Sequence, residues 1–335
     1  MRTSLHHGCF QALSILAAAT LLSFTAMAAD PGTPFPDASA LSDQRAGSVL
    51  IYNLYSSSAA NPIAENTRIN ITNTSETAMI AVHLFFIDGS TCSPADNFIC
   101  LTANQTMTLN ASEFDPGTMG YIVAVAVDPG TGCPVKHNFL IGDAYIKMAE
   151  GFQANLGAEA VTAVDLSGLG CDAGSSTATL TFNGAQYGRL PMVLAVDSVP
   201  SIQDGNATLL VINNPSGDFS TAANPVGIVF GILYSQLEVP FSFTFDRSDR
   251  CQVKERLTDR FPRTAPRFTN IVPAGTTGWM KFWSVSNQPL TGAMINLNRN
   301  AATVATAYNQ GHNLHKLTLF PSAAITIPVF PANCR

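Results

Sequence analysis

Two histidines lie three positions apart near the C-terminus, in Gln310-Gly311-His312-Asn313-Leu314-His315. Histidine is the commonest metal ligand and the usual base near neutral pH. Side chains three apart point to opposite faces of a strand but share one face of a helical turn. A copper or zinc site needs further ligands, and the sequence marks none. We therefore predict no metal centre and no cofactor. His312 and His315 are the metal candidates, in a polar loop before a strand.

The segment Trp279-Met280-Lys281-Phe282-Trp283 contains both tryptophans of the protein. In a strand, Trp279, Lys281 and Trp283 share one side. If Met280 and Phe282 fill the core, the two rings and the ammonium group form an exposed surface suited to stacking on sugar rings. The opposite orientation buries the rings in the core or between domains. We expect packing, and the exposed ligand-binding surface is the alternative.

Recognisable catalytic motifs are absent from the sequence. It contains no Gly-x-Ser-x-Gly turn, no phosphate-binding glycine loop and no His-Glu-x-x-His helix. The carboxylates that could support glycoside hydrolysis, such as Glu113 and Asp143, have no shared spacing and lie among turn residues. We predict no catalytic residues and a protein that is not an enzyme.

The N-terminus has the pattern of a secretory signal peptide. Arg2 precedes an apolar stretch from Ala12 to Phe24, and Ala26-Met27-Ala28 provides a small-x-small cleavage site. We expect cleavage after residue 28, no transmembrane segment in the mature chain, and a secreted or periplasmic location. Residues 29–46 are rich in Pro, Asp, Ser and Ala and are expected to form a flexible leader.

Six cysteines follow the predicted signal peptide, an even number that favours three disulfides in an exported protein. Fifteen pairings are possible for six cysteines. We prefer pairs within each half of the chain, and a thiolate metal site is the alternative. The preferred pairs are Cys92–Cys100, Cys133–Cys171 and Cys251–Cys334.

Short apolar segments rich in Val, Ile, Thr, Phe and Tyr recur between Gly, Asn, Pro and Asp turns, which is typical of antiparallel strands. Helical periodicity is scarce. One exception is the charged segment Asp246 to Arg263, where Cys251, Lys254, Leu257 and Phe261 have helical spacing. We expect a short amphipathic helix there, in a solvated insertion. A docking surface for an anionic partner is the alternative.

Two halves of the chain share a weak pattern. Gly117-Thr118-Met119-Gly120-Tyr121 and Gly275-Thr276-Thr277-Gly278-Trp279 each lead into an apolar strand, and an Asn turn follows an earlier strand in each half. With these motifs the chain resembles uncharacterised secreted bacterial proteins built from immunoglobulin-like modules. The resemblance implies an all-β fold of two tandem antiparallel immunoglobulin-like β-sandwiches. We place one at residues 47–190 and the other, with the charged insertion, at residues 191–335.

Charged residues make up 12% of the sequence, hydrophobic residues 46%, and the net charge is −6. This composition predicts a large core and disfavours nucleic acid as a partner. We expect an exported, non-catalytic structural or adhesion-type protein of the cell surface or extracellular space, with a polysaccharide or another surface protein as partner. The alternatives are a carbohydrate-binding module that uses the tryptophans, and a secreted hydrolase of an unrecognised kind.

Overall fold

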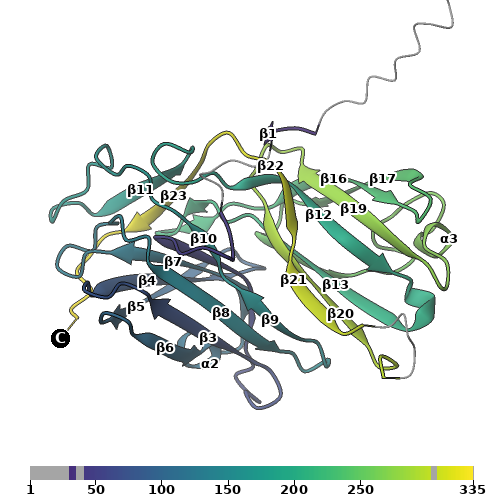
Figure 1. Cartoon of the computed structure of the whole chain (residues 1–335), viewed down its shortest axis with the longest axis horizontal. Coiled ribbons are helices and arrows are strands. Elements are labelled where there is room, and N and C mark those ends of the chain that lie inside the picture. The colour runs from purple at the N-terminus through teal and green to yellow at the C-terminus, as the bar shows by residue number, and fades with distance from the viewer. Residues whose placement is uncertain (1–29, 35–40, 303–307, 335) are drawn as a thin grey trace, which may run out of the picture. The chain divides into compact units, whose positions relative to one another are not determined.

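A computed structural model describes residues 30–34, 41–302 and 308–334 (Figure 1). This part of the chain is all-β, as the sequence predicts, and the apolar segments expected to be strands lie in strands. The described helices are one-turn elements, and none is long and apolar enough to cross a bilayer. They are η1 (Ile202–Asp204), α2 (Ala111–Phe114) and α3 (Phe268–Ile271). The predicted signal peptide, residues 1–28, and part of the predicted leader lie outside the described residues.

The strands form five sheets, whose neighbours are antiparallel except for the parallel pair β14 and β23. We call them the five-stranded sheet, the six-stranded sheet, and the β3, β13 and β23 sheets. The five-stranded sheet has the order β10 (Glu159–Val161), β2 (Val49–Ser56), β7 (Met119–Val127), β4 (Ile80–Asp88) and β5 (Pro94–Leu101). The β3 sheet has the order β6 (Thr106–Asn110), β3 (Asn66–Asn73), β8 (Leu140–Lys147) and β9 (Gln153–Gly157).

The second half of the chain supplies most strands of the other three sheets. The six-stranded sheet has the order β1 (Thr33–Pro34), β22 (His315–Leu319), β12 (Pro191–Pro200), β19 (Thr277–Ser284), β16 (Gly227–Tyr234) and β17 (Pro240–Arg247). The β13 sheet has the order β18 (Gln252–Arg256), β13 (Asn206–Asn213), β20 (Thr291–Asn298) and β21 (Gln310–Asn313). The β23 sheet has the order β11 (Thr177–Phe182), β23 (Ala323–Pro328), β14 (Gly217–Asp218) and β15 (Ala222–Ala223).

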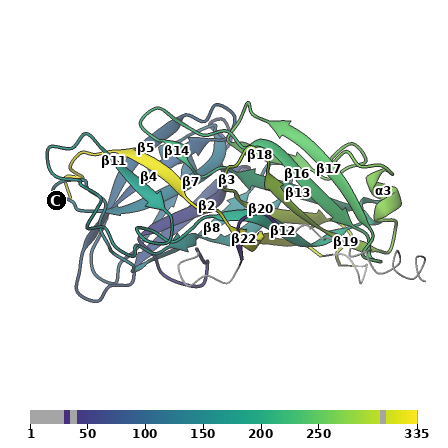
Figure 2. The ribbon, with the colours of Figure 1, turned by 90° about the horizontal axis from the view of Figure 1, so that it is seen from above.

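Alternation along the strands explains the layering of the sheets. In β2, Val49 and Ile51 pack in a cluster with residues of the β23 sheet, whereas Leu50 and Tyr52 pack with residues of the β3 sheet. The five-stranded sheet is therefore covered on both faces, in accordance with its continuous apolar strands. A third cluster combines side chains of the six-stranded sheet and the β13 sheet. Figure 2 shows these two sheets in the same part of the molecule.

The prediction of two tandem immunoglobulin-like sandwiches is wrong. β23, near the C-terminus, pairs along its whole length with β11, which lies in the other predicted half. Leu209 and Val211 of β13 belong to the cluster that contains the core side chains of β3 and β4. The described residues from Pro31 onward accordingly form one compact unit. The physical reason is that strand periodicity reports which side chains are buried but not which distant strand they pair with.

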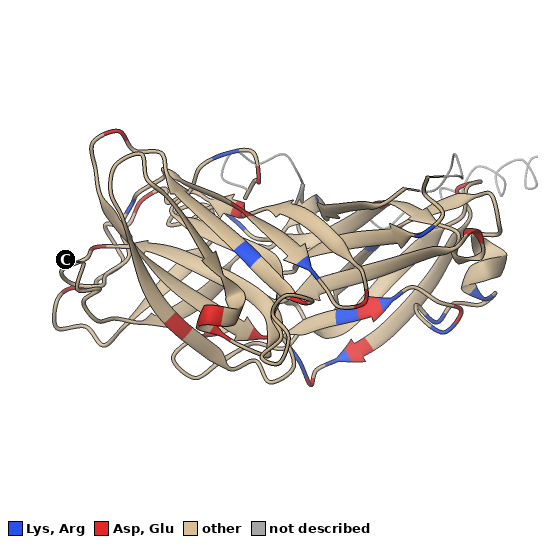
Figure 3. Ribbon diagram, turned by 90° about the horizontal axis from the view of Figure 1, so that it is seen from below, with Lys and Arg blue, Asp and Glu red and all other residues tan. Residues whose placement is uncertain are grey.

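The helix predicted in the charged segment Asp246 to Arg263 is also wrong. Residues Gln252–Arg256 form β18 instead, which pairs with β13 and buries Val253 completely. The surrounding charges form ion pairs, such as Arg247 with Glu255 at 2.7 Å. Across the rest of the described chain, charged residues are sparse and the two signs are interspersed (Figure 3).

Candidate metal centre

Asp197 projects from an irregular point in β12. Leu194 and Val196 point into the core between the six-stranded and β13 sheets. Ala195 alternates with them and so belongs to the outer face of the sheet. The register of β12 against β19 shifts between Val196 and Val199, which marks a bulge at this position. Bulges redirect side chains, and the Asp197 carboxylate is 57% exposed here.

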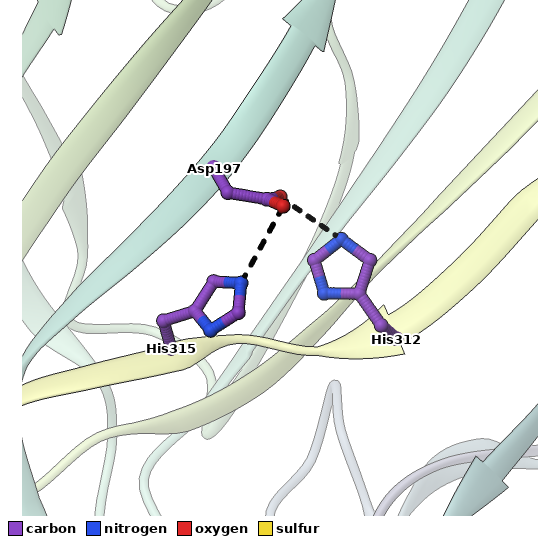
Figure 4. A group of neighbouring side chains, drawn as sticks. All are labelled: Asp197, His312 and His315. Carbon is purple, nitrogen blue, oxygen red and sulfur yellow. Dashed lines mark ion pairs between the residues drawn. The ribbon is translucent and has the colours of Figure 1, made fainter.

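His312 and His315 reach Asp197 because the chain changes sheets between them. His312 lies in β21 of the β13 sheet, and His315 begins β22 of the six-stranded sheet. Leu314, at the junction, is buried and its amide donates to the carbonyl of Gly292. The rule that residues three apart on a strand diverge does not apply across this junction. Figure 4 shows both imidazoles directed toward the Asp197 carboxylate.

Buried polar contacts fix the segment that carries the two histidines. Asn313 donates from Nδ2 to the carbonyl of Gly157 at 2.7 Å and accepts from Nδ2 of Asn53 at 2.9 Å. Lys316 forms an ion pair of 2.7 Å with Glu159, whose side chain is 1% exposed. Removing one partner of a buried ion pair is strongly destabilising, so these contacts keep the segment in one conformation.

The three side chains bring three ligand atoms together. Nε2 of His312 lies 3.3 Å from Oδ1 of Asp197, and Nε2 of His315 lies 3.6 Å from Oδ2. One ligand atom from each residue can be chosen so that all three lie within 4.8 Å of one another. Nδ1 of His312 donates to the Asn313 carbonyl at 2.8 Å, which leaves Nε2 as the nitrogen directed at Asp197.

These distances fit a tetrahedral zinc ion. Zinc lies about 2.0–2.2 Å from imidazole nitrogen and carboxylate oxygen, so tetrahedral ligand atoms are about 3.3 Å apart. The separation from His312 Nε2 to Oδ1 of Asp197, 3.3 Å, matches that value, and the separation from His315 Nε2 to the other oxygen, Oδ2, is 3.6 Å. Two histidines and one carboxylate leave a fourth position for water or a ligand.

The structure orients the tryptophan strand with its rings away from the core between the six-stranded and β13 sheets. Met280 and Phe282 are completely buried in that core. Trp279, Lys281 and Trp283 therefore lie together on the outer face, where all three are partly exposed. This is the orientation required for the alternative of a ligand-binding surface. Trp283 also packs against the cluster formed with the β23 sheet.

The cysteines pair differently from the preferred scheme. Cys133 and Cys171 form a disulfide, but Cys100 pairs with Cys334, so the expected Cys92–Cys100 and Cys251–Cys334 bonds are wrong. Cys92 and Cys251 are buried thiols. The preferred pairs were chosen within each half of the chain. The fold instead brings the C-terminal segment beyond β23 beside β5, so Cys334 meets Cys100.

Asp197 was missed by the sequence analysis. It follows an apolar strand, and no regular spacing connects it to His312, 115 positions later. The only signal was the pair Asp197-Ser198, two polar residues that interrupt an apolar stretch.

Comparisons with known proteins do not identify the chain. No protein-family model and no curated protein match it. Among solved structures, the secreted serine protease VesC from Vibrio cholerae is 9% identical over 85% of this chain, with a TM-score of 0.14. The alignment covers 51% of that protein, so this chain spans about half of its length. A TM-score this low supports no conclusion about fold or activity, and the resemblance to immunoglobulin-like proteins gains no support.

Proposed function

We propose that this is an exported, non-catalytic β-protein that binds a divalent transition-metal ion, with Zn²⁺ held by Asp197, His312 and His315. The observation that carries the proposal is the convergence of three ligand atoms from three strands within 4.8 Å. Imidazole and carboxylate are ordinary zinc ligands, and the hydrogen bond from His312 to Asn313 resembles the contacts that orient zinc-bound histidines.

Export is part of the proposal and rests on two features. The N-terminal sequence has the layout of a signal peptide, and the chain contains disulfides, which persist in oxidising compartments. A location at the cell surface or in the extracellular space is consistent with both.

Titration calorimetry with ZnCl₂ tests the metal site. The wild-type protein is expected to bind one equivalent. The replacements Asp197→Asn, His312→Ala and His315→Ala should each weaken binding by tenfold or more, because even the loss of a residue that only hydrogen-bonds to a metal ligand costs about 10–100-fold in affinity. Glu76→Gln, which changes an exposed carboxylate elsewhere, is the matched control and should leave binding unchanged.

Zinc bound only to the native state also raises thermal stability, by about 2.7 kcal/mol at a free concentration 100 times the Kd. A triple variant at these positions should lose that increase while its melting temperature without metal stays near that of the wild type. Equal zinc stoichiometry in the wild type and the triple variant would exclude this site.

Metal-dependent hydrolysis is a second candidate, favoured by the fourth coordination position that three protein ligands leave open. Zinc lowers the pKa of bound water to about 7 and so supplies hydroxide near neutral pH. Screening of glycans, esters and peptides with zinc and with chelator tests it. Turnover that disappears in His315→Ala would replace the non-catalytic proposal.

A further inference from the structure

β18 is the end strand of the β13 sheet, and its other edge has no strand beside it in the described part of the chain. Hydrogen-bonded and non-hydrogen-bonded pairs alternate along an antiparallel ladder. Just before the strand, the carbonyl of Cys251 accepts from the amide of Asn214, so the odd-numbered residues of β18 form the hydrogen-bonded pairs with β13. The amide and carbonyl groups of Lys254 and Arg256 therefore point to the open edge.

Neighbouring loops close this edge at both ends and leave its middle open. At one end, the outward amide of Gln252 donates to the carbonyl of Gly89 at 3.1 Å, as it would to an added strand. At the other end, the amide of Thr258 donates to the carbonyl of Phe261 at 2.7 Å. Between these ends, the outward backbone groups of β18 have no backbone partner among the described residues. Each outward residue there offers one donor and one acceptor to a further chain.

A groove of about 540 Å³ follows the open edge. Its lining includes three consecutive residues of β18, Lys254, Glu255 and Arg256. Side chains alternate between the two faces of a strand, so a cavity that all three line lies along the strand edge. Arg260 and Phe261 of the following turn also line it. The groove therefore has the position that an added β-strand would take.

Positive charge predominates in the groove. Four basic and two acidic residues line it, whereas the whole chain has a net charge of −6. The two acidic residues, Glu255 and Glu150, are already paired with arginines at 2.7 and 3.3 Å. Lys254 and Arg260 form no ion pair with a carboxylate in the described chain. An anionic group that enters the groove therefore meets two cations that no carboxylate neutralises.

The strand register favours a peptide with carboxylates at alternate positions. Lys254 and Arg256 share one face of β18, opposite to the face of the buried Val253. On a strand added beside β18, two residues that are also two positions apart face these cations. Aspartate or glutamate at both positions places a carboxylate beside each cation. A second copy of this chain, pairing antiparallel through the same open groups, would bring cations opposite cations, which is destabilising.

We propose that the open edge of β18 binds an extended acidic segment of a partner protein, which adds a strand to the β13 sheet and places alternate carboxylates beside Lys254 and Arg256. In this mode of recognition, main-chain hydrogen bonds supply affinity and the alternate side chains supply specificity. The proposal goes beyond the metal site and is independent of it, because Asp197, His312 and His315 do not line the groove.

Fluorescence anisotropy with a labelled Glu-Val-Glu-Val-Glu peptide, blocked at both termini, tests the proposal. The wild type should bind it with and without EDTA, and raising NaCl to about 0.5 M should weaken binding about fivefold or more, because salt screens the charges. Lys254→Glu should weaken binding by about tenfold, because like charges then face each other across the added pair. Arg260→Ala, which removes the second cation without a carboxylate partner, should weaken it by about threefold. Lys136→Glu, which changes the net charge by the same amount at an exposed position outside the groove, is the matched control and should bind normally.

Two methylated peptides separate strand pairing from charge attraction. One carries N-methyl groups on the glutamate amides and the other on the valine amides. Only alternate amides of a strand face its neighbour, so one peptide loses the donors that bond to β18 and the other keeps them. Their affinities for the wild type should differ by about tenfold, since main-chain hydrogen bonds carry the affinity.

Four outcomes would overturn the proposal. Equal affinities of the methylated peptides would leave charge attraction without an added strand. Competition by dextran sulfate as strong as by the unlabelled peptide would replace the peptide with an anionic polysaccharide. Absence of binding would show that the charges serve only to prevent association of the edge. A dimer of the free protein in analytical ultracentrifugation that Lys254→Glu alters would assign the edge to a second copy of this chain.

Discussion

His83 shows how one buried residue makes stability depend on pH. Its imidazole is completely buried in β4, stacks on Phe98 at 3.9 Å, and places Nε2 2.8 Å from Oδ2 of Asp96. Burial lowers the pKa of His83 below the ordinary value of 6.5, while the hydrogen bond and charge of Asp96 oppose the shift. The interior place of His83 follows from its strand, because a strand covered on both faces leaves no solvated position.

The pKa shift predicts a loss of stability on acidification. Because the folded pKa lies below the unfolded one, the unfolded chain binds the proton at higher pH, and native stability falls as pH drops below about 6.5. One proton contributes at most about 1.4 kcal/mol per pH unit. In His83→Gln, the decrease in unfolding free energy between pH 7.5 and 5, measured by urea denaturation, should be smaller. His137, whose pKa burial also lowers, retains its contribution. An unchanged pH dependence would contradict this account.

The metal site shows what residue patterns can predict. Sequence alone offered His312 and His315 as metal candidates while predicting no metal centre, since histidines are rare in this chain. It could not supply Asp197, because a ligand set is completed by strands that meet only in the fold. The tryptophans illustrate the same limit, since alternation placed Trp279 and Trp283 together but could not decide which side was solvated.

At the scale of the element, Gly231 determines how β16 pairs with β17. The ring of Phe243 covers Gly231, and a Cβ added there would lie 2.2 Å from its Cζ atom. Gly231→Ala should therefore displace the ring and destabilise the protein by about 1–3 kcal/mol, the usual cost of overpacking. Guanidinium denaturation measures the change. Gly168→Ala is the matched control, because nothing lies within 4 Å of a Cβ at that exposed turn, and it should change stability by less than about 0.5 kcal/mol. Equal effects of the two replacements would show that the Phe243 contact is unimportant.

Strands were predictable from the sequence, but their partners were not. Alternation indicated β19 as a strand because it buries one set of side chains, Met280 and Phe282, in a core. The same local reasoning failed for β18, where helical spacing of Cys251 and Leu257 was outweighed by pairing with β13. Local periodicity is a weak guide when a partner strand can satisfy a segment's backbone hydrogen bonds.

At the scale of the whole molecule, covalent links join segments far apart in the sequence. The Cys100–Cys334 disulfide spans 234 positions and attaches the segment after β23 to β5. In the chain-entropy model a closure of this length stabilises by roughly 5 kcal/mol, against about 3–4 kcal/mol for the 38-position Cys133–Cys171 link. The long link therefore holds together a fold whose sheets combine both halves of the sequence.

Cys92 and Cys251 offer a third link of the same kind. Both thiols are buried in one cluster and contact each other, and both residues donate to the carbonyl of Asp88, from the Cys92 amide at 2.8 Å and the Cys251 thiol at 3.2 Å. The neighbouring Cys251 side chain lowers the pKa of Cys92, which favours the nucleophilic thiolate. In an oxidising compartment, the two thiols should pass two protons and two electrons to a disulfide-containing oxidant, which becomes a dithiol as the Sγ–Sγ bond forms.

The number of free thiols in unfolded protein decides whether this link forms. Protein isolated under oxidising conditions and unfolded in guanidinium with maleimide should show no labelling of Cys92 or Cys251 by mass spectrometry. The same sample reduced beforehand should show both labelled. Cys92→Ser should leave Cys251 labelled without reduction, which excludes exchange with another cysteine. Labelling of both thiols in the unreduced wild type would contradict the third link. It would show that the oxidant does not reach Cys92 and Cys251, which are only 8% and 0% exposed.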